Sequence, residues 1–196
     1  MYAVLFDFIG YVMSAATVLA SELGDRTMIA TAAFAAARGE FVRTVAVSVA
    51  AFTLANLPVV LAGTLISKYL NLMYLRLISA VLFITVGLII ILSKREAGII
   101  GREASLTLFF TTILLSELGD KSQLTLLSLT LIYGCLPALT GAITAYAAVN
   151  IASAAILNKL VSRYLSTRKA LSVIKYATGS FFIVSGVVFL FVANVL

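Results

Sequence analysis

Residues 17–27 of the chain read TVLASELGDRT, and residues 112–122 read TILLSELGDKS. Seven of the eleven positions are identical at an offset of 95 residues, and three of the others are conservative exchanges. The same offset aligns residues 67–70 with 162–165, and with four residues inserted it aligns 82–87 with 181–186. The similarity therefore extends across both halves of the chain and indicates a duplicated sequence.

The composition is that of a membrane protein. Hydrophobic residues make up 62% of the 196 residues and charged residues 11%, with a mean hydropathy of +1.14, whereas soluble domains carry about 25% charged residues. The chain has no histidine and one cysteine, which excludes imidazole zinc sites, bis-histidine haem and an internal disulfide. No basic stripe with interleaved aromatic residues is present, so nucleic acid is not an expected partner, and the lipid bilayer is.

The apolar segments predict six membrane-spanning helices, since a hydrocarbon core of about 30 Å needs about 20 residues. The expected spans are residues 8–36, 43–67, 72–93, 104–132, 136–158 and 171–195. The first and fourth are too long for one straight crossing, and each has a polar cluster at its middle. Both are expected to be tilted or interrupted.

Three helices in each half form an odd number, so the second half must enter the membrane from the opposite side. The fold class that we predict is an all-α integral membrane protein, with six transmembrane helices arranged as two inverted three-helix repeats. Residues 1–196 then form a single transmembrane transporter domain, with repeat one at 1–93, a short cytoplasmic linker at 94–103 and repeat two at 104–196. Inverted repeats are common in secondary transporters, which bind substrate near the midplane.

The distribution of basic residues predicts the orientation. The loops after the first, third and fifth spans hold ten Lys and Arg residues, whereas the opposite side holds only Lys68 and Arg76. Positively charged loops stay in the cytoplasm, so both termini are expected outside. No organellar targeting segment is recognisable, and we expect a multi-pass protein of the cell (plasma) membrane.

Four of the eight acidic residues lie within the twin motifs: Glu22, Asp25, Glu117 and Asp120. Each pair is spaced i, i+3, which places two carboxylates on one face of a helix. A charged group inside the membrane costs about 2.5–3.5 kcal/mol on insertion scales and usually marks an ion path. Carboxylates suit hard cations such as Ca²⁺, Mg²⁺ and Mn²⁺, so these four residues are the predicted metal ligands.

Neutral oxygen donors lie near these acids. Thr27, Ser122 and Gln123 are adjacent to the motifs, and Asn56 and Asn150 occupy nearly equivalent places in the second and fifth spans. All five are candidate supporting ligands. For the two asparagines, an interhelical hydrogen bond is at least as strong an expectation.

Arg26 and Lys121 follow the glutamates at i+4 and can balance part of their charge. Four carboxylates and two cations leave a net charge of −2, which one divalent cation or two protons would cancel. The motifs therefore predict a competition between metal and H⁺. The structural alternative is that each motif is an internal ion pair that only holds helices together.

Both motifs fit E-x-G-D-[KR]-[ST], as Glu22–Thr27 and Glu117–Ser122. This duplicated signature resembles that of the Gdt-type divalent cation/proton exchangers. The resemblance implies that the four acids carry the cation, with Thr27, Ser122 and Gln123 as helpers. It also implies export of Mn²⁺ and/or Ca²⁺ from the cytosol in exchange for H⁺, with the cation as transported substrate, no permanently bound cofactor and no enzymatic activity.

Two alternatives stay open at this point. One is a six-helix exporter of small organic cations or amino acids, although four acids are many for a monovalent ammonium. The other is a membrane-embedded metal-dependent enzyme, which would need a basic pocket at the membrane surface. The sequence does not choose between Mn²⁺ and Ca²⁺ or between H⁺ and Na⁺, and a homo-oligomer is possible.

Overall fold

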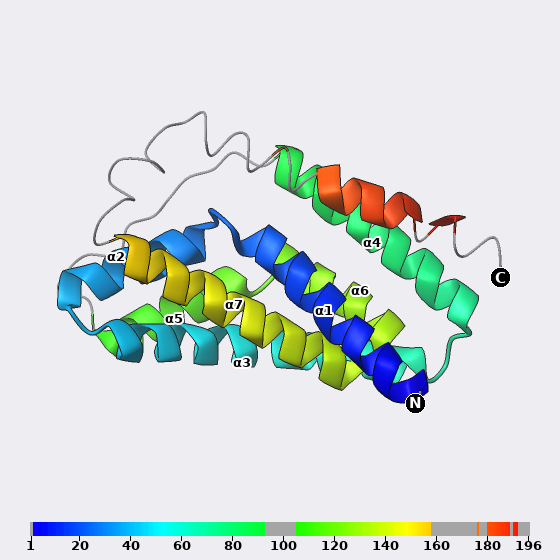
Figure 1. Ribbon diagram of the computed structural model, residues 1–196, viewed down its shortest axis with the longest axis horizontal. Coiled ribbons are helices and arrows are strands. Elements are labelled where there is room, and N and C mark those ends of the chain that lie inside the picture. Colours follow the sequence, from blue (N-terminus) through cyan, green and yellow to red (C-terminus); the bar gives the residue numbers. More distant parts are fainter. Residues whose placement is uncertain (1, 93–104, 158–175, 177–179, 189, 192–196) are drawn as a thin grey trace.

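The computed structural model of the chain describes residues 2–92, 105–157, 176, 180–188 and 190–191. Its helices are α1 (Tyr2–Glu22), α2 (Arg26–Arg38), α3 (Phe41–Ser67), α4 (Leu72–Leu92), α5 (Leu106–Glu117), α6 (Lys121–Tyr133) and α7 (Cys135–Leu157), and residues 180–188 are also helical (Figure 1). The expected linker at 94–103, and much of the expected sixth span, lie outside the described residues.

The two long spans, expected to be tilted or interrupted, are both interrupted. The break between α1 and α2 contains Gly24 at φ +71°, and the break between α5 and α6 contains Gly119 at φ +77°. Only glycine adopts this left-handed backbone without steric cost, so the two glycines allow the chain to leave one helix and start the next. Asp25 and Asp120 then occupy the N-cap positions of α2 and α6.

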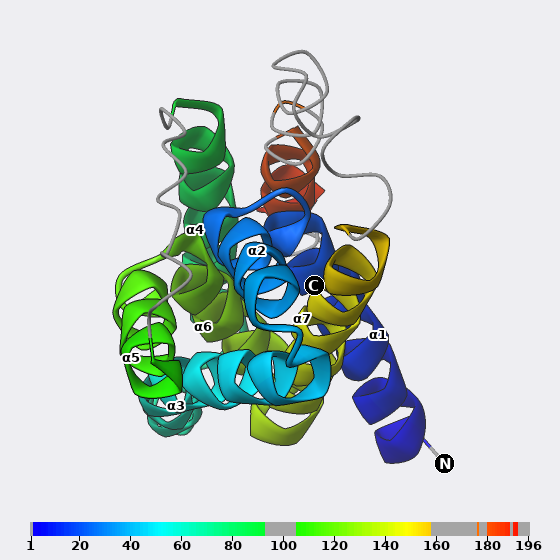
Figure 2. The same ribbon diagram turned by 90° about the vertical axis from the view of Figure 1, so that its left-hand side faces the viewer.

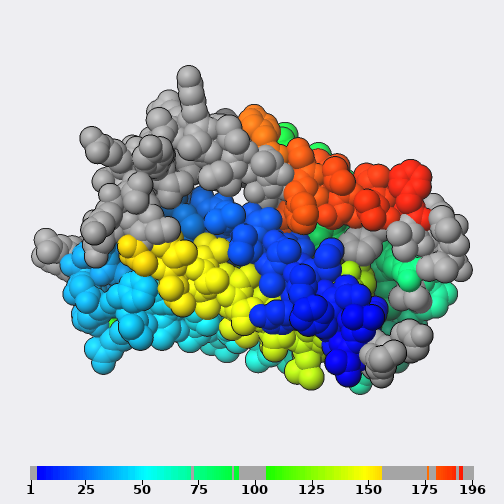
Figure 3. Space-filling view, viewed as in Figure 1, coloured from blue at the N-terminus to red at the C-terminus, as the bar shows by residue number. Residues whose placement is uncertain are grey.

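The interrupted helices run in opposite directions. In Figure 1, α1 and α2 lead from the right of the molecule to the left, and α5 and α6 lead from left to right. Helix α1 packs against α7, α3 packs against α5 and α6, and α4 packs against α6 (Figure 2). Figure 3 shows α1 and α7 side by side on one face of the molecule. The two breaks thereby meet in the middle of the helix bundle.

The bundle buries polar residues beside its apolar core, and its exposed surface carries many large apolar side chains. Ser48 and Asn56 of α3 are fully buried, whereas Leu61 and Leu65 of the same helix are exposed. In the part of the chain that the structure describes, three helices are long and apolar enough to cross a membrane: Val4–Glu22, Phe41–Ser67 and Cys135–Ala155. A polar interior with an apolar exterior is stable in lipid, where apolar surface faces the acyl chains and polar groups need internal partners.

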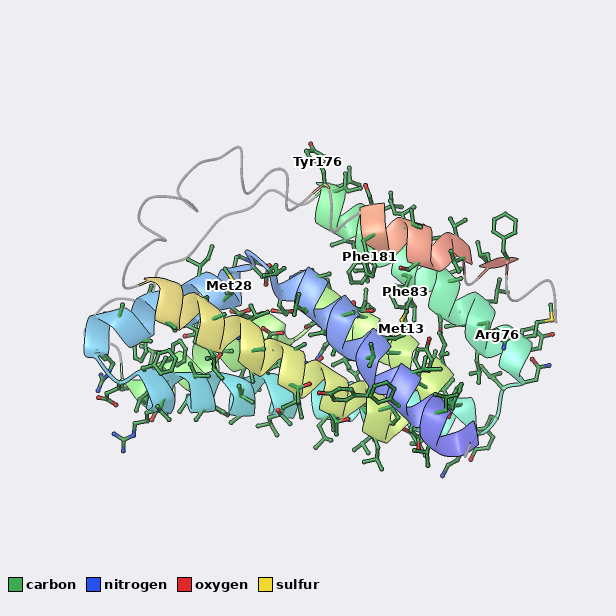
Figure 4. All side chains as sticks on the ribbon, in the orientation of Figure 1. Met13, Met28, Arg76, Phe83, Tyr176 and Phe181 are labelled. Atoms are coloured by element: carbon green, nitrogen blue, oxygen red, sulfur yellow. The ribbon has the colours of Figure 1, made fainter. Side chains whose placement is uncertain are left out.

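Helix α4 pairs with the helical residues 180–188. The rings of Phe83 and Phe182 are 5.6 Å apart, and Figure 4 shows Phe83 and Phe181 along this contact. Gly186 fits so closely that an added Cβ would lie 2.8 Å from the carbonyl oxygen of Ala80. This pair packs beside the bundle that holds the breaks.

The connection between α2 and α3 is charged. Glu40 forms ion pairs with Arg38 at 3.1 Å and with Arg43 at 3.4 Å, and the Arg38 hydrogen bond holds the pKa of the Glu40 carboxyl below its ordinary value. Arg76 lies at the opposite end of the molecule, near the start of α4 (Figure 4). The two groups of basic residues that the sequence assigns to opposite membrane faces are therefore at opposite ends.

Candidate metal centre

The acidic residues of the two motifs lie where the helices are broken. Glu22 ends α1 and Glu117 ends α5, so each carboxylate projects from the last turn before a break. The first break is held by Met28, whose sulfur accepts a hydrogen bond from the backbone N–H of Gly24 at 3.4 Å (Figure 4). Because a helix break exposes backbone groups, such places are used for ion sites in membrane transporters.

Three of the four predicted ligands converge. One carboxylate oxygen each from Glu22, Glu117 and Asp120 lie within 4.8 Å of one another. The two glutamates are 1% exposed. Ca²⁺ holds its oxygen ligands at about 2.3–2.6 Å, so ligands on opposite sides of the ion are about 5 Å apart. The three oxygens therefore already have a spacing that a single hard cation could span.

Each glutamate has one oxygen bound and one free. The Ser122 hydroxyl donates to Glu117 Oε2 at 2.9 Å, and the Thr27 hydroxyl donates to Glu22 Oε2 at 3.4 Å. The Oε1 atoms of both glutamates are buried and have no hydrogen-bond partner in the part of the chain that the structure describes. A buried polar atom without a partner is costly, so these two oxygens are available to a cation or a proton.

Lys121 connects the two motifs. Its Nζ lies 2.9 Å from Asp25 Oδ1 and 3.2 Å from Asp120 Oδ2. It thus pairs with the aspartates, whereas the spacing in the sequence had suggested Glu117. Asp25 takes part in the site through this ion pair and lies outside the cluster of three converging oxygens.

Arg26 does not share the role of Lys121. Its side chain is exposed, and it forms no ion pair within the described ranges 2–92 and 105–157. Neither Asp25 nor Asp120 caps its helix through the side chain, although aspartate at this position usually binds the first N–H groups. Both carboxylates are therefore directed to Lys121 and the site.

The neutral residues differ in what they offer. Gln123 Oε1 accepts from the Gly119 N–H at 2.9 Å, and its Nε2 donates to the carbonyl of Ala55 at 2.8 Å, so Gln123 fastens the second break to α3. Asn56 and Asn150 each donate Nδ2 to the carbonyl four residues earlier at 2.9 Å. Their Oδ1 atoms are buried without a partner among the described residues, which leaves two amide oxygens free.

One residue near the site was not predicted from the sequence. Tyr146 of α7 is fully buried, and its ring stacks on Phe52 of α3 with centroids 4.0 Å apart. Phe52 and Tyr146 align at the same spacing as Asn56 and Asn150. The sequence signal that could have identified Tyr146 is that the equivalent residue in the first repeat is a phenylalanine. The hydroxyl therefore has no counterpart in the other repeat.

A family model described as "Divalent cation/proton antiporter GDT1" matches residues 10–98 and 105–195. The chain belongs to the GDT1 family. Comparisons with curated proteins and with solved structures gave no match. GDT1 proteins are transporters and not enzymes, which excludes the alternative of a membrane-embedded metal-dependent enzyme.

Family membership gives a chemical meaning to the site. A divalent cation/proton antiporter must hold either M²⁺ or H⁺, and both bind to carboxylate oxygens. This member of the GDT1 family has buried carboxylate oxygens at the junction of its two broken helices, and within the described residues they have no hydrogen-bond partner. Oxygens of this kind can accept either a cation or a proton.

Proposed function

We propose that this GDT1-family protein is a secondary transporter that exports Mn²⁺ and/or Ca²⁺ from the cytosol in exchange for H⁺. The observation that carries the proposal is the convergence of oxygens from Glu22, Glu117 and Asp120 within 4.8 Å, with both glutamates buried. The site offers oxygen donors and no histidine or cysteine, which favours hard cations over copper or zinc. The transported cation is a substrate, and no permanently bound cofactor is needed.

The ligand set that we propose is Glu22, Asp25, Glu117 and Asp120. Thr27 and Ser122 hold the glutamates, and Gln123 holds the second break. The free amide oxygens of Asn56 and Asn150 are the proposed additional ligands, and Lys121 balances the charge of the two aspartates. Arg26 is proposed to contribute in a different state of the transporter, since its side chain is exposed here.

The proposed architecture is a single transporter domain of six spans, built from two inverted three-helix repeats at 1–93 and 104–196. The opposite directions of the two broken helices in Figure 1 support this arrangement, as does the repeat in the sequence. In inverted-repeat carriers the substrate site lies near the midplane, and one repeat moves against the other. The junction of the two breaks fits such a site.

Exchange follows from the need to neutralise the acids. An excess of buried negative charge is unfavourable in the membrane, so we propose that the site crosses between its two open states only when it carries metal or protons. Inward movement of protons then drives the cation outward. With basic loops in the cytosol of a plasma membrane, both termini lie outside.

The test is transport by the purified full-length protein in proteoliposomes with an imposed pH gradient. Radiolabelled Mn²⁺ and Ca²⁺ should move against the proton flux, and Glu117→Gln should abolish this movement. Glu40→Gln, which removes an acid outside the site, should not. Movement that depends on a Na⁺ gradient, or movement of organic cations or amino acids without Mn²⁺ and Ca²⁺, would contradict the proposal.

A further inference from the structure

A line of buried hydroxyl groups joins three helices beside the metal centre. The Tyr146 hydroxyl of α7 lies 2.9 Å from Ser48 Oγ of α3, and Ser48 Oγ lies 2.9 Å from Thr31 Oγ1 of α2. All three side chains are fully buried. Other buried hydroxyls of the bundle bond to a backbone carbonyl of their own helix, as Ser128 does, whereas these three bond to one another across helices.

At its Tyr146 end, the line of hydroxyls reaches the metal centre. Thr27 lies close enough to the Tyr146 hydroxyl to interact with it, and the Thr27 hydroxyl donates to Glu22 Oε2 at 3.4 Å. Four hydroxyls therefore lead from the Glu22 carboxylate to Thr31. Each hydroxyl has one donor and two acceptor positions, so all four can donate in the same direction, toward the carboxylate.

The repeat shows that this line is not a requirement of the fold. The position equivalent to Thr31 is Leu126 at the offset of 95. At the offset of 94 that aligns Asn56 with Asn150, Ser48 is equivalent to Ala142 and Tyr146 to Phe52. Leu126, Ala142 and Phe52 are all buried apolar residues. The two halves thus share their acids, but within the described residues Glu117 is bonded to a single hydroxyl, that of Ser122, whereas Glu22 is next to a series of hydroxyls.

The line is directed toward one end of the molecule. Thr31 lies on α2 between the metal centre and Arg38, at the end that we propose to be cytosolic. Thr44 lies one turn before Ser48 on α3, and its buried hydroxyl has no hydrogen-bond partner in the described part of the chain. A further buried hydroxyl thus lies between Ser48 and the connection at Glu40, although no hydrogen bond joins it to the line among the described residues.

We propose that Tyr146 relays protons between the metal centre and the Arg38–Glu40 end, through Ser48 and Thr31 on one side and Thr27 on the other. In each transfer, a hydroxyl oxygen takes a proton from one neighbour and releases its own to the next. No group gains a net charge, and the hydroxyls rotate back before the next proton. The inference rests on the proposed metal/proton exchange and adds the route of the proton.

The experiment separates two modes of transport by the full chain in proteoliposomes. Mn²⁺ uptake driven by a pH gradient needs protons to reach the site, whereas exchange of radiolabelled for unlabelled Mn²⁺ at equal pH does not. Tyr146→Phe removes only the hydroxyl. It should lower gradient-driven uptake by about tenfold or more, as expected for loss of a proton-transfer group, and leave Mn²⁺/Mn²⁺ exchange within about twofold of wild type.

Two further variants complete the test. Tyr133→Phe is the matched control, because its hydroxyl lies on α6 outside this line, and it should change neither mode. Ser48→Ala interrupts the line at a second place and should show the same selective loss if Tyr146→Phe does not fold.

The outcomes are distinguishable. Gradient-driven uptake that is unchanged in both Tyr146→Phe and Ser48→Ala overturns the relay. Loss of both transport modes in a folded variant also overturns it, because Tyr146 would then serve metal binding or packing. Wild-type protein without gradient-driven uptake would instead refute the proposed exchange itself.

Discussion

The ammonium of Lys121 lies 2.9 Å from a carboxylate oxygen of Asp25, so the cation of the second motif is bound to an acid of the first. It also lies 3.2 Å from Asp120. The side chains are only 10% exposed for Lys121 and 19% exposed for each aspartate. Asp25, Lys121 and Asp120 thus form an ion triad that joins the two helix breaks next to the converging acids.

Removal of the Lys121 charge should therefore damage the protein more than removal of the Arg26 charge. Lys121→Gln leaves two aspartates near each other without a cation, and loss of one partner of a buried ion pair typically costs about 3–5 kcal/mol. Arg26→Gln changes an exposed side chain. Thermal unfolding in detergent and Mn²⁺ uptake should show a large loss for the first variant and a small one for the second. Equal losses would contradict the role assigned to Lys121.

Substitution of either buried glutamate should abolish metal binding without unfolding the protein. Glu22→Gln and Glu117→Gln keep the size of the side chain and remove the charge. Even outer-shell changes cost about 10–100-fold in metal affinity, so loss of a direct ligand should weaken Mn²⁺ binding by more than about 100-fold. Isothermal titration measures the affinity, with Glu40→Gln as the control. Wild-type affinity in both variants would show that the metal binds elsewhere.

Replacement of Gly119, in the second break, should impair transport more than it lowers the stability of the protein. Gly119 and Gly39 have similar positive φ angles of +77° and +69°, and an added Cβ would meet no atom within 4 Å at either place. Alanine at each should cost about 1–2 kcal/mol from the backbone alone. Only Gly119→Ala also shifts Glu117 and Asp120, so only this variant should lose Mn²⁺ uptake. The check is unfolding and uptake for both variants side by side, and equal uptake would refute a functional role for the break.

The sequence predicted the broken helices because each polar motif lay inside an apolar segment too long for one crossing, with Gly24 or Gly119 at its centre. It also pointed to the acids, since charges inside a membrane protein usually mark a function. The structure brings oxygens of Glu22, Glu117 and Asp120 together, and metal binding by the four acids stays a prediction. The sequence did not predict that Lys121 is nearly buried in an ion pair whereas Arg26 is exposed. Two nearly identical motifs suggest identical roles, and only the ion pair between Lys121 and Asp25 across the two breaks shows which cation is buried.

The hydroxyl of Tyr146 illustrates a second limit. An aromatic residue in an apolar helix is usually part of the core, and the sequence does not show which side chains from α2 and α3 lie against it. The hydrogen bonds to Ser48 and Thr31 depend on three helices that are distant in sequence. Such a contact follows from tertiary packing and not from local spacing.

The central claim is that metal and protons compete for the same carboxylates, and calorimetry of Mn²⁺ binding tests it most directly. Protonated carboxylates cannot bind the metal, so lowering the pH from about 8 to about 6 should weaken binding, and each bound Mn²⁺ should release protons. Titrations in buffers of different ionisation enthalpy measure that number. We predict a release of at least about one proton per Mn²⁺, reduced in Glu117→Gln. A release of zero protons across this pH range would contradict the account and favour Na⁺ coupling or a channel.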